Sequence, residues 1–341
     1  MNAKIGGNEE LSPIIFYYDE LEGLEYLWPR LEERFRQAGH ARPILFREYD
    51  SYKELPGRDG DLYSYDAIVL SALVDKGFLR SLPKTVSCER VFPWVVENGK
   101  VRQRSYGVPF MLCSNSLICR QQDDLHVHNI MELNEDVAIP LRSMLMFYFV
   151  QAVCENVSPR KSFLVMEHLL DLIGGRDFLE KSGMSDYDGI NRFENGECRY
   201  LLSFTETLHE LKKDDYAVSF INFSDRDESK RPRFLADFVS LGKNAPSEKL
   251  QDCLDLMDIL ISEEFIYELC TADGEFQYLL PADRCVFRRL AEIDTIYRSL
   301  YDQVESEKNG ILRYGKRFYE NFYTGRDILL QMLWERACWR P

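Results

Sequence analysis

Short apolar runs and amphipathic segments alternate along the first part of the chain. Residues 13–18 form an apolar and aromatic run that predicts a buried strand. Residues 21–40 repeat apolar positions every three or four residues, which predicts a helix that Pro29 would kink or begin. A second strand is predicted over 43–46, and residues 62–82 predict a third strand followed by a helix. This order favours an α/β lobe with a largely parallel sheet.

Farther along the chain, longer helical segments separate isolated extended runs. The extended runs cover residues 105–120, 198–206 and 233–241, and helical periodicity covers 139–157, 162–174, 248–269 and 284–307. A chain of 341 residues also exceeds what one compact core usually holds. We therefore expect two α/β lobes joined by extended crossings. Residues 1–112 and 237–300 would form the first lobe, residues 113–236 the second, and residues 301–341 C-terminal helices packed on the lobes.

Composition and charge exclude some classes of ligand. Hydrophobic residues make up 45% and charged residues 29% of the chain, as in ordinary folded proteins. The 42 basic and 57 acidic residues leave a net charge of −15, which repels phosphate backbones and anionic membranes and attracts small cations. No apolar run is long enough to span a membrane. We expect a small-molecule substrate, a monomer, and neither a nucleic-acid nor a membrane partner.

The nine cysteines are an odd number, with no CxxC pair and no Cys/His spacing suited to zinc. The N-terminal residues show none of the features of a signal peptide. These observations predict a reduced, cytoplasmic chain with no metal and no cofactor.

Candidate chemistry lies where strands end, because ligands of open parallel sheets sit beyond the carboxyl ends of the strands. Tyr18 and Asp19 end the first predicted strand, and Asp66 ends the third. Glu206 follows a later extended run, and Asp237 lies within another. These side chains would meet only if the two lobes face each other. A single carboxylate at a strand end is more often a helix cap, and Asp66 is well placed to cap the helix that follows it.

Cys113 lies in an otherwise apolar run, where a lone cysteine is usually a small buried hydrophobe. A nucleophilic thiolate needs a base or a positive field beside it. None of the five histidines is an evident partner. A carboxylate such as Glu206 could act as the base if burial raises its pKa toward neutrality.

The segment around Cys113 resembles the one that carries the nucleophilic cysteine of the thiaminase I (thiamine pyridinylase) family, in a YG(I/V)PxxLCxN pattern. The matching residues are Tyr106, Gly107, Pro109, Leu112, Cys113 and Asn115. FYYDE at 16–20 and DSY at 50–52 are also similar to family segments, and SFTETL at 203–208 resembles the segment with the catalytic glutamate. The likeness spans about residues 13–241.

This resemblance implies an α/β, two-lobed type II periplasmic-binding-protein-like fold with a ligand cleft between the lobes. It implies catalytic roles for Cys113 and Glu206, and substrate-binding roles for Tyr18, Tyr52, Asp66, Tyr187 and Asp237. The implied partners are thiamine and a nucleophilic co-substrate such as an amine or pyridine. Thiamine would be cleaved at its methylene bridge through a covalent adduct between cysteine and pyrimidine.

Three departures from the family pattern leave alternatives open. Phe16, Phe204 and Leu235 stand where the family has tyrosines, so three hydroxyl groups are absent. One alternative is a related enzyme that acts on another pyrimidine or thiazolium compound. The other is a non-catalytic protein that binds thiamine or a pyrimidine, although such a protein would have no need of Cys113 together with Glu206.

Overall fold

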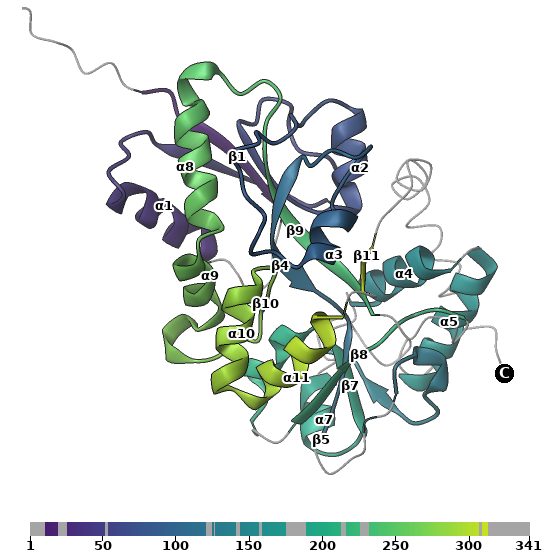
Figure 1. Ribbon diagram of the computed structural model, residues 1–341. Helices are drawn as coiled ribbons and strands as arrows, with labels where there is room; N and C mark the ends of the chain where they lie inside the picture. The colour runs from purple at the N-terminus through teal and green to yellow at the C-terminus, as the bar shows by residue number, and fades with distance from the viewer. Residues whose placement is uncertain are drawn as a thin grey trace, which may run out of the picture.

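The computed structural model describes residues 11–19, 26–51, 54–120, 125, 127–140, 144–156, 159–174, 189–212, 216–225, 232–306 and 309–312. Within these ranges the chain forms two β-sheets with helices packed around them, one sheet in each of two lobes (Figure 1). One hydrophobic core covers the first sheet and continues onto residues of the second sheet, and a second core lies between the second sheet and helices α4 (Met144–Glu155) and α5 (Pro159–Leu172). The predicted α/β architecture with two lobes is confirmed.

The sheet of the first lobe runs in the order β10-β4-β9-β3-β1-β2, with β11 paired to β9. Its strands are β1 (Ile14–Asp19), β2 (Ile44–Tyr49), β3 (Leu62–Asp66), β4 (Gly107–Cys113), β9 (Arg233–Leu241), β10 (Leu280–Pro281) and β11 (Gly310–Ile311). β1 pairs in parallel with β2 and β3, as predicted. β9 returns from the second lobe and inserts antiparallel between β3 and β4, which makes the sheet mixed rather than largely parallel.

The sheet of the second lobe has the order β6-β7-β5-β8. Its strands are β5 (Ser116–Arg120), β6 (Val137–Ala138), β7 (Tyr200–Ser203) and β8 (Tyr216–Phe220). β5 follows β4 after two residues and pairs antiparallel with both β7 and β8. The strand that ends at Cys113 therefore leads directly into the centre of the second sheet.

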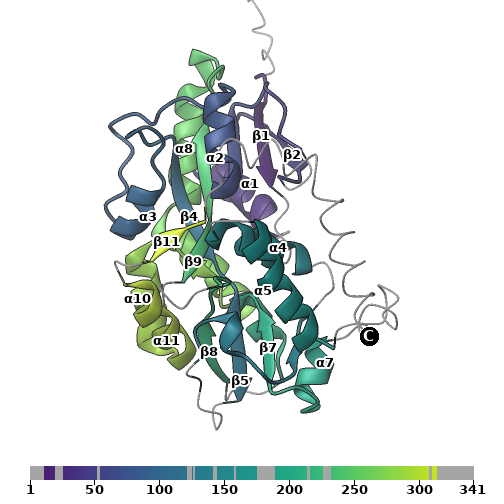
Figure 2. The same cartoon turned by 90° about the vertical axis from the view of Figure 1, so that its right-hand side faces the viewer.

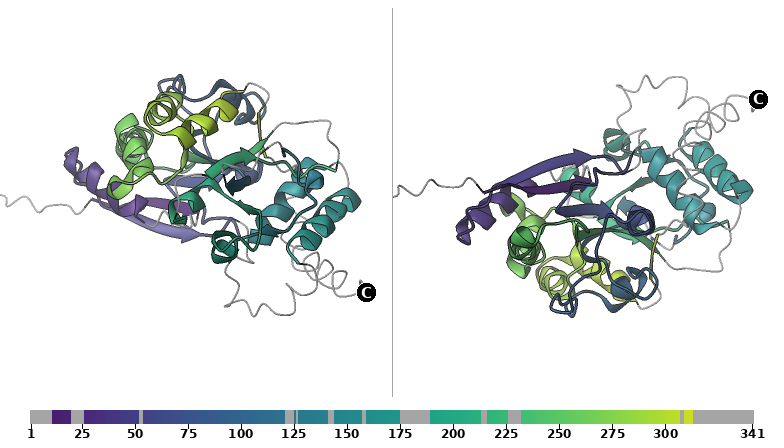
Figure 3. Two further views of the ribbon diagram at one scale, coloured as in Figure 1. Left: turned by 90° about the horizontal axis from the view of Figure 1, so that it is seen from below. Right: turned by 90° about the horizontal axis from the view of Figure 1, so that it is seen from above.

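Helices cover both sheets. The helices of the first lobe are α1 (Leu27–Gln37), α2 (Ala67–Asp75), α3 (Pro93–Asn98), α8 (Leu250–Leu260) and α9 (Glu263–Cys270). Those of the second lobe are α4 (Met144–Glu155), α5 (Pro159–Leu172) and α7 (Gly189–Glu194). Two more helices follow α9 along the chain, α10 (Arg284–Ile293) and α11 (Thr295–Val304). Four 3₁₀ helices are described, namely η1 (Ile130–Glu132), η2 (Thr205–Glu210), η3 (Ser247–Lys249) and η4 (Ala272–Gly274). Helices α4 and α5 pack on each other (Figure 2), and α8 to α11, coloured green to yellow, line one side of the molecule (Figure 3).

Two predicted helices are each broken in two by a capping side chain. Ser262 divides the segment 248–269, because its hydroxyl accepts a hydrogen bond from the Phe265 N–H and starts α9. Asp294 likewise divides 284–307, since its carboxylate accepts from the Tyr297 N–H and starts α11. The second break turns α11 toward the second lobe, where it contacts β8.

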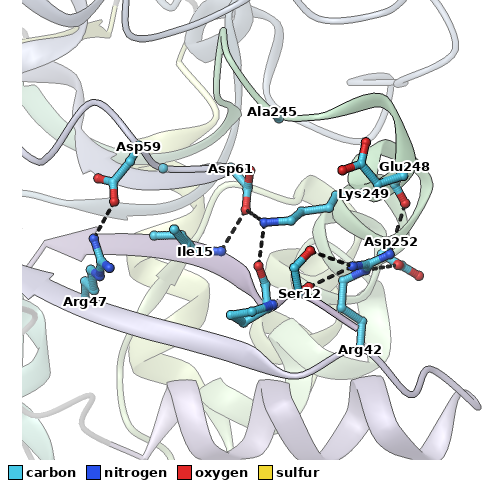
Figure 4. Close-up of polar contacts among 12 residues, drawn as sticks. Ser12, Ile15, Arg42, Arg47, Asp59, Asp61, Ala245, Glu248, Lys249 and Asp252 are labelled. Carbon is cyan, nitrogen blue, oxygen red and sulfur yellow. Dashed lines mark hydrogen bonds and ion pairs between the residues drawn. The ribbon is translucent and has the colours of Figure 1, made fainter. Parts of the chain in front are cut away.

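A buried ion pair holds β1 in place between β3 and the edge strand β2 of the first sheet (Figure 4). Lys249 Nζ lies 2.8 Å from Asp61 Oδ2 and donates to the Pro13 carbonyl at 2.6 Å. The same carboxylate accepts from the Ile15 N–H at 2.9 Å. Because both charged groups are buried, removing either one would leave an unpaired charge in the core. These contacts help to fix the strand that ends at Asp19.

Candidate active site

Three adjacent strands bring Cys113, Asp237 and Asp66 to one region of the first sheet. Asp66 on β3 and Asp237 on β9 are directly opposite partners in the antiparallel pairing. On the other side of β9, Asp237 lies opposite Met111, and Cys113 lies opposite Leu235. The two aspartates are thus cross-strand neighbours, an arrangement in which like charges repel.

Asp66 has the capping role that the sequence predicts. It precedes α2, and its carboxylate accepts a hydrogen bond from the Ile68 N–H at 2.9 Å. The side chain is only 7% exposed. Its negative charge nevertheless acts on its neighbours, because it raises the pKa values of both Asp237 and Cys113.

Asp237 is half-buried in the middle of β9. Burial raises the pKa of Asp237 well above its usual range, and the negative charges of Asp66, Asp19 and Glu206 raise it further. A carboxyl group in this environment gains from any cation that comes to lie beside it.

Cys113 is half-buried at the end of β4. Burial raises the pKa of the Cys113 thiol well above its usual range, and the charges of Glu206, Asp237 and Asp66 add to that effect in this order. Within the described part of the chain, the charged groups that act on this thiol are all acidic. The thiol is therefore protonated at rest, and a thiolate requires a base and a nearby positive charge.

Glu206 is supplied by the other lobe, on the 3₁₀ helix η2 that follows β7. Burial raises the pKa of Glu206 to about 7. Its side chain is half-buried, with Thr205 Oγ1 donating to Oε2 at 3.5 Å. A carboxyl group with this pKa gains and loses a proton near neutral pH, as a general base must. The negative charge of Glu206 raises the pKa of Cys113, so the two groups lie within electrostatic range of each other.

Asp19 joins the same group of acids. It ends β1, is 5% exposed, and accepts a hydrogen bond from the Ser51 N–H at 2.8 Å. Burial raises the pKa of Asp19 to about 6, and its charge raises the pKa of Asp237. The position of Asp19 at a strand end marks it as a candidate in the sequence, but the family resemblance selects its neighbour Tyr18 instead.

Tyr18 is the one predicted tyrosine that lies among the described residues. It donates to Glu48 at 2.9 Å, and its ring lies 4.6 Å from that of Trp28 on α1. Because Phe16 pairs with Leu62 and side chains alternate along each strand, Tyr18 lies on the same face of the sheet as Asp66 and its partner Asp237. The role of Tyr18 in substrate binding stays a prediction. Tyr52 and Tyr187 lie outside the described residues.

Apolar side chains occupy the three positions at which the family has tyrosines. Leu235 lies directly opposite Cys113 on β9. The Phe204 ring packs 5.5 Å from Phe147 on α4, and Phe16 is buried against Trp28. The surroundings of Cys113 are consequently acidic on one side and apolar on the other.

The described residues include no group of three or more His, Cys, Asp or Glu side chains arranged to hold a metal ion. Among the helices in this part of the chain, none is both long and apolar enough to cross a membrane.

Comparison with known proteins finds a relative that matches most of the chain. The chain is 25% identical over 334 residues to thiaminase-1 of Paenibacillus thiaminolyticus, with 85% of this chain and 80% of the relative covered. It is a homologue of thiaminase I. A search of family models gives no match.

Solved structures agree with this homology at the level of the fold. Clostridium botulinum thiaminase I in complex with thiamin superposes with a TM-score of 0.78 at 20% identity, covering 94% of this chain and 99% of the other. A maltose/maltodextrin-binding domain of Bdellovibrio bacteriovorus bound to maltotriose gives a TM-score of 0.66 at 10% identity, with 94% of each chain covered. The predicted periplasmic-binding-protein-like fold is thus confirmed.

Proposed function

We propose that this protein is a thiamine pyridinylase, which cleaves thiamine at its methylene bridge and transfers the aminopyrimidine-methyl group to a nucleophile. The observation that carries this proposal is the proximity of Cys113 to Glu206, which come from different lobes, beside Asp66 and Asp237. Homology to thiaminase I supports it.

The acidic group suits a cationic substrate. Thiamine carries a permanent positive charge on its thiazolium ring, and the chain has a net charge of −15. The negative charges of Asp66 and Asp19 repel that of Asp237, which adds to the effect of burial on the pKa of Asp237. A bound cation would relieve this repulsion, so part of the binding energy comes from charges that the fold has already brought together.

The covalent step begins with the transfer of the Cys113 proton to Glu206. The thiolate then adds to the pyrimidine carbon next to a ring nitrogen, forming a carbon–sulfur bond while Asp237 and Asp66 stabilise the protonated pyrimidine. The bond from the bridging methylene to the thiazole nitrogen breaks, and its electron pair leaves with the neutral thiazole. The positive charge of the substrate also favours the thiolate, which offsets the acidic surroundings of Cys113.

Transfer completes the reaction. An amine, a pyridine or another nucleophile bonds to the methylene carbon, the thiolate is expelled as the pyrimidine ring is restored, and Glu206 returns the proton to the sulfur. The covalent adduct divides one difficult displacement into two easier steps.

Leu235 and Phe204 favour a second candidate, a related enzyme for another pyrimidine or thiazolium compound. Leu235 places an alkyl group directly opposite Cys113, and Phe204 places an aromatic ring two residues before Glu206. Each would accept a less polar substituent than thiamine carries. Turnover of a panel of thiamine analogues distinguishes the two substrates.

The direct test is thiazole release, followed by chromatography, from thiamine incubated with the protein and pyridine or aniline. We expect Cys113→Ser to lower turnover by more than about 1,000-fold, because the nucleophile is lost. The exposed Cys285 provides the matched control, and Cys285→Ser should leave the rate unchanged. Undiminished turnover by Cys113→Ser would contradict the proposal. Thiamine binding without turnover by the wild type would indicate a non-catalytic binding protein.

A further inference from the structure

Glu206 lies on an element that is weak by itself. The helix η2 is a short 3₁₀ helix without a side-chain cap at its N-terminus. Hydrogen bonds in 3₁₀ helices have poor geometry, so such a turn holds its shape only where neighbouring segments restrain it. The orientation of Glu206 therefore depends on contacts outside η2.

A pair of hydroxyl groups restrains this turn. Thr207, the residue after Glu206, lies with its Oγ1 2.6 Å from the Oγ of Ser203, the last residue of β7. Ser203 is 1% exposed and Thr207 is 8% exposed. Because water has little access here, a hydroxyl that is removed from this pair is not replaced by solvent.

The same pair is joined to β5, the strand that begins three residues after Cys113. Ser116 on β5 is the directly opposite partner of Ser203, and its Oγ donates to the Ser203 carbonyl at 2.9 Å. Ser116 follows Cys113 by only three residues and is fully buried. Ser116 thus ties the end of β7, from which η2 follows, to the start of β5.

We propose that Ser203 and Thr207 are positioning residues that hold the side chain of Glu206 toward Cys113 for proton transfer, with Ser116 tying them to the start of β5. This inference rests on the proposed function. Neither hydroxyl group ionises near neutral pH, so any change that their removal causes in the pH dependence of Cys113 must act through Glu206.

The experiment measures alkylation of Cys113 by iodoacetamide as a function of pH, with peptide mass spectrometry to separate the cysteines. Exposed Cys285 serves as the internal reference. Since the negative charge of Glu206 raises the pKa of Cys113, we expect Thr207→Val and Ser203→Ala, which release Glu206, to speed Cys113 alkylation at pH 7.5 by up to about tenfold, toward the profile of Glu206→Gln. Thr207→Ser, which keeps the hydroxyl group, should restore the wild-type profile.

Ser162→Ala is the matched control, since Ser162 is a buried serine of the same lobe that donates to the Ala152 carbonyl. It should leave the alkylation profile unchanged. A wild-type profile in Thr207→Val would overturn the inference, as would an equally large change in Ser162→Ala. Thermal unfolding of each variant shows whether it is folded. Alkylation needs no thiamine, so this experiment tests the positioning of Glu206 separately from the proposed function, which thiazole release tests.

Discussion

At the scale of single residues, burial changes the chemistry of two ordinary side chains. Glu206 acquires a pKa of about 7 from its surroundings, while the pKa of Cys113 is raised well above its usual range. A thiol that stays protonated in the empty site resists oxidation and unwanted alkylation. Reactivity then depends on Glu206 and on the positive charge of the substrate.

The pKa of Glu206 predicts how the rate depends on pH. Only ionised Glu206 can accept the Cys113 proton, so kcat/KM should rise with pH through about 7 and level off above it. Glu206→Gln should lose this rise and lower kcat at pH 8 by about 100-fold, with KM nearly unchanged. Steady-state kinetics from pH 5 to 9 measure both effects. A rise near pH 7 that persists in Glu206→Gln would assign it to another group.

At the scale of elements, Asp66 combines a structural role with the proposed binding role. It caps α2 through the Ile68 N–H, and it stands opposite Asp237 in the sheet. The capping hydrogen bond keeps the carboxylate at the end of β3, so one side chain serves both the helix and the acidic group. The capping role, which the sequence predicts, is therefore compatible with a role in binding.

Two substitutions separate these roles of Asp66. Asp66→Asn keeps a good capping acceptor and loses the charge, whereas Asp66→Ala loses both. We expect thiamine affinity to fall by at least about tenfold in both variants, as for one lost charge-assisted contact. Asp66→Ala should be less stable than Asp66→Asn by about 1 kcal/mol. Calorimetric titration and urea unfolding measure the two quantities, and equal stabilities would show that the cap contributes nothing.

At the scale of the whole molecule, the fold buries acidic groups, and this burial opposes its own stability. The pKa values of Asp19, Glu206 and Asp237 are all raised, so the unfolded chain ionises these groups more readily than the folded protein does. Stability from these groups is therefore greatest at low pH and falls as the pH rises through their folded pKa values. Such opposition is common where a site is built for binding rather than for stability.

Asp19→Asn should stabilise the protein while weakening the binding of thiamine. The pKa of Asp19 is about 6 in the folded protein and 3.8 ordinarily, so its ionisation opposes folding above pH 6 and has no effect below pH 3.8. The variant should gain about 1–3 kcal/mol at pH 8 and much less at pH 4.5. Asparagine can still accept from the Ser51 N–H. Chemical unfolding at both pH values tests this, and an equal gain at the two would exclude the charge as its cause.

Patterns along the chain were sufficient for much of the local structure and for the identity of the central residues. The extended run 233–241 coincides with β9, and Pro29 lies in the first turn of α1. Capping by Asp66 was also predictable, because it depends only on residues next to it in sequence. Cys113 and Glu206 were selected through a local motif and its family resemblance.

Only the tertiary structure decided how these residues act on one another. It inserted β9 antiparallel between β3 and β4, which placed Asp237 opposite Asp66. It also added Asp19 to the acidic group and brought Glu206 from the other lobe close to Cys113. Local sequence specifies local structure because propensity and capping act over a few residues. A pKa depends on burial and on charges that strand pairing brings together from distant parts of the chain, so it is determined only once the chain has folded.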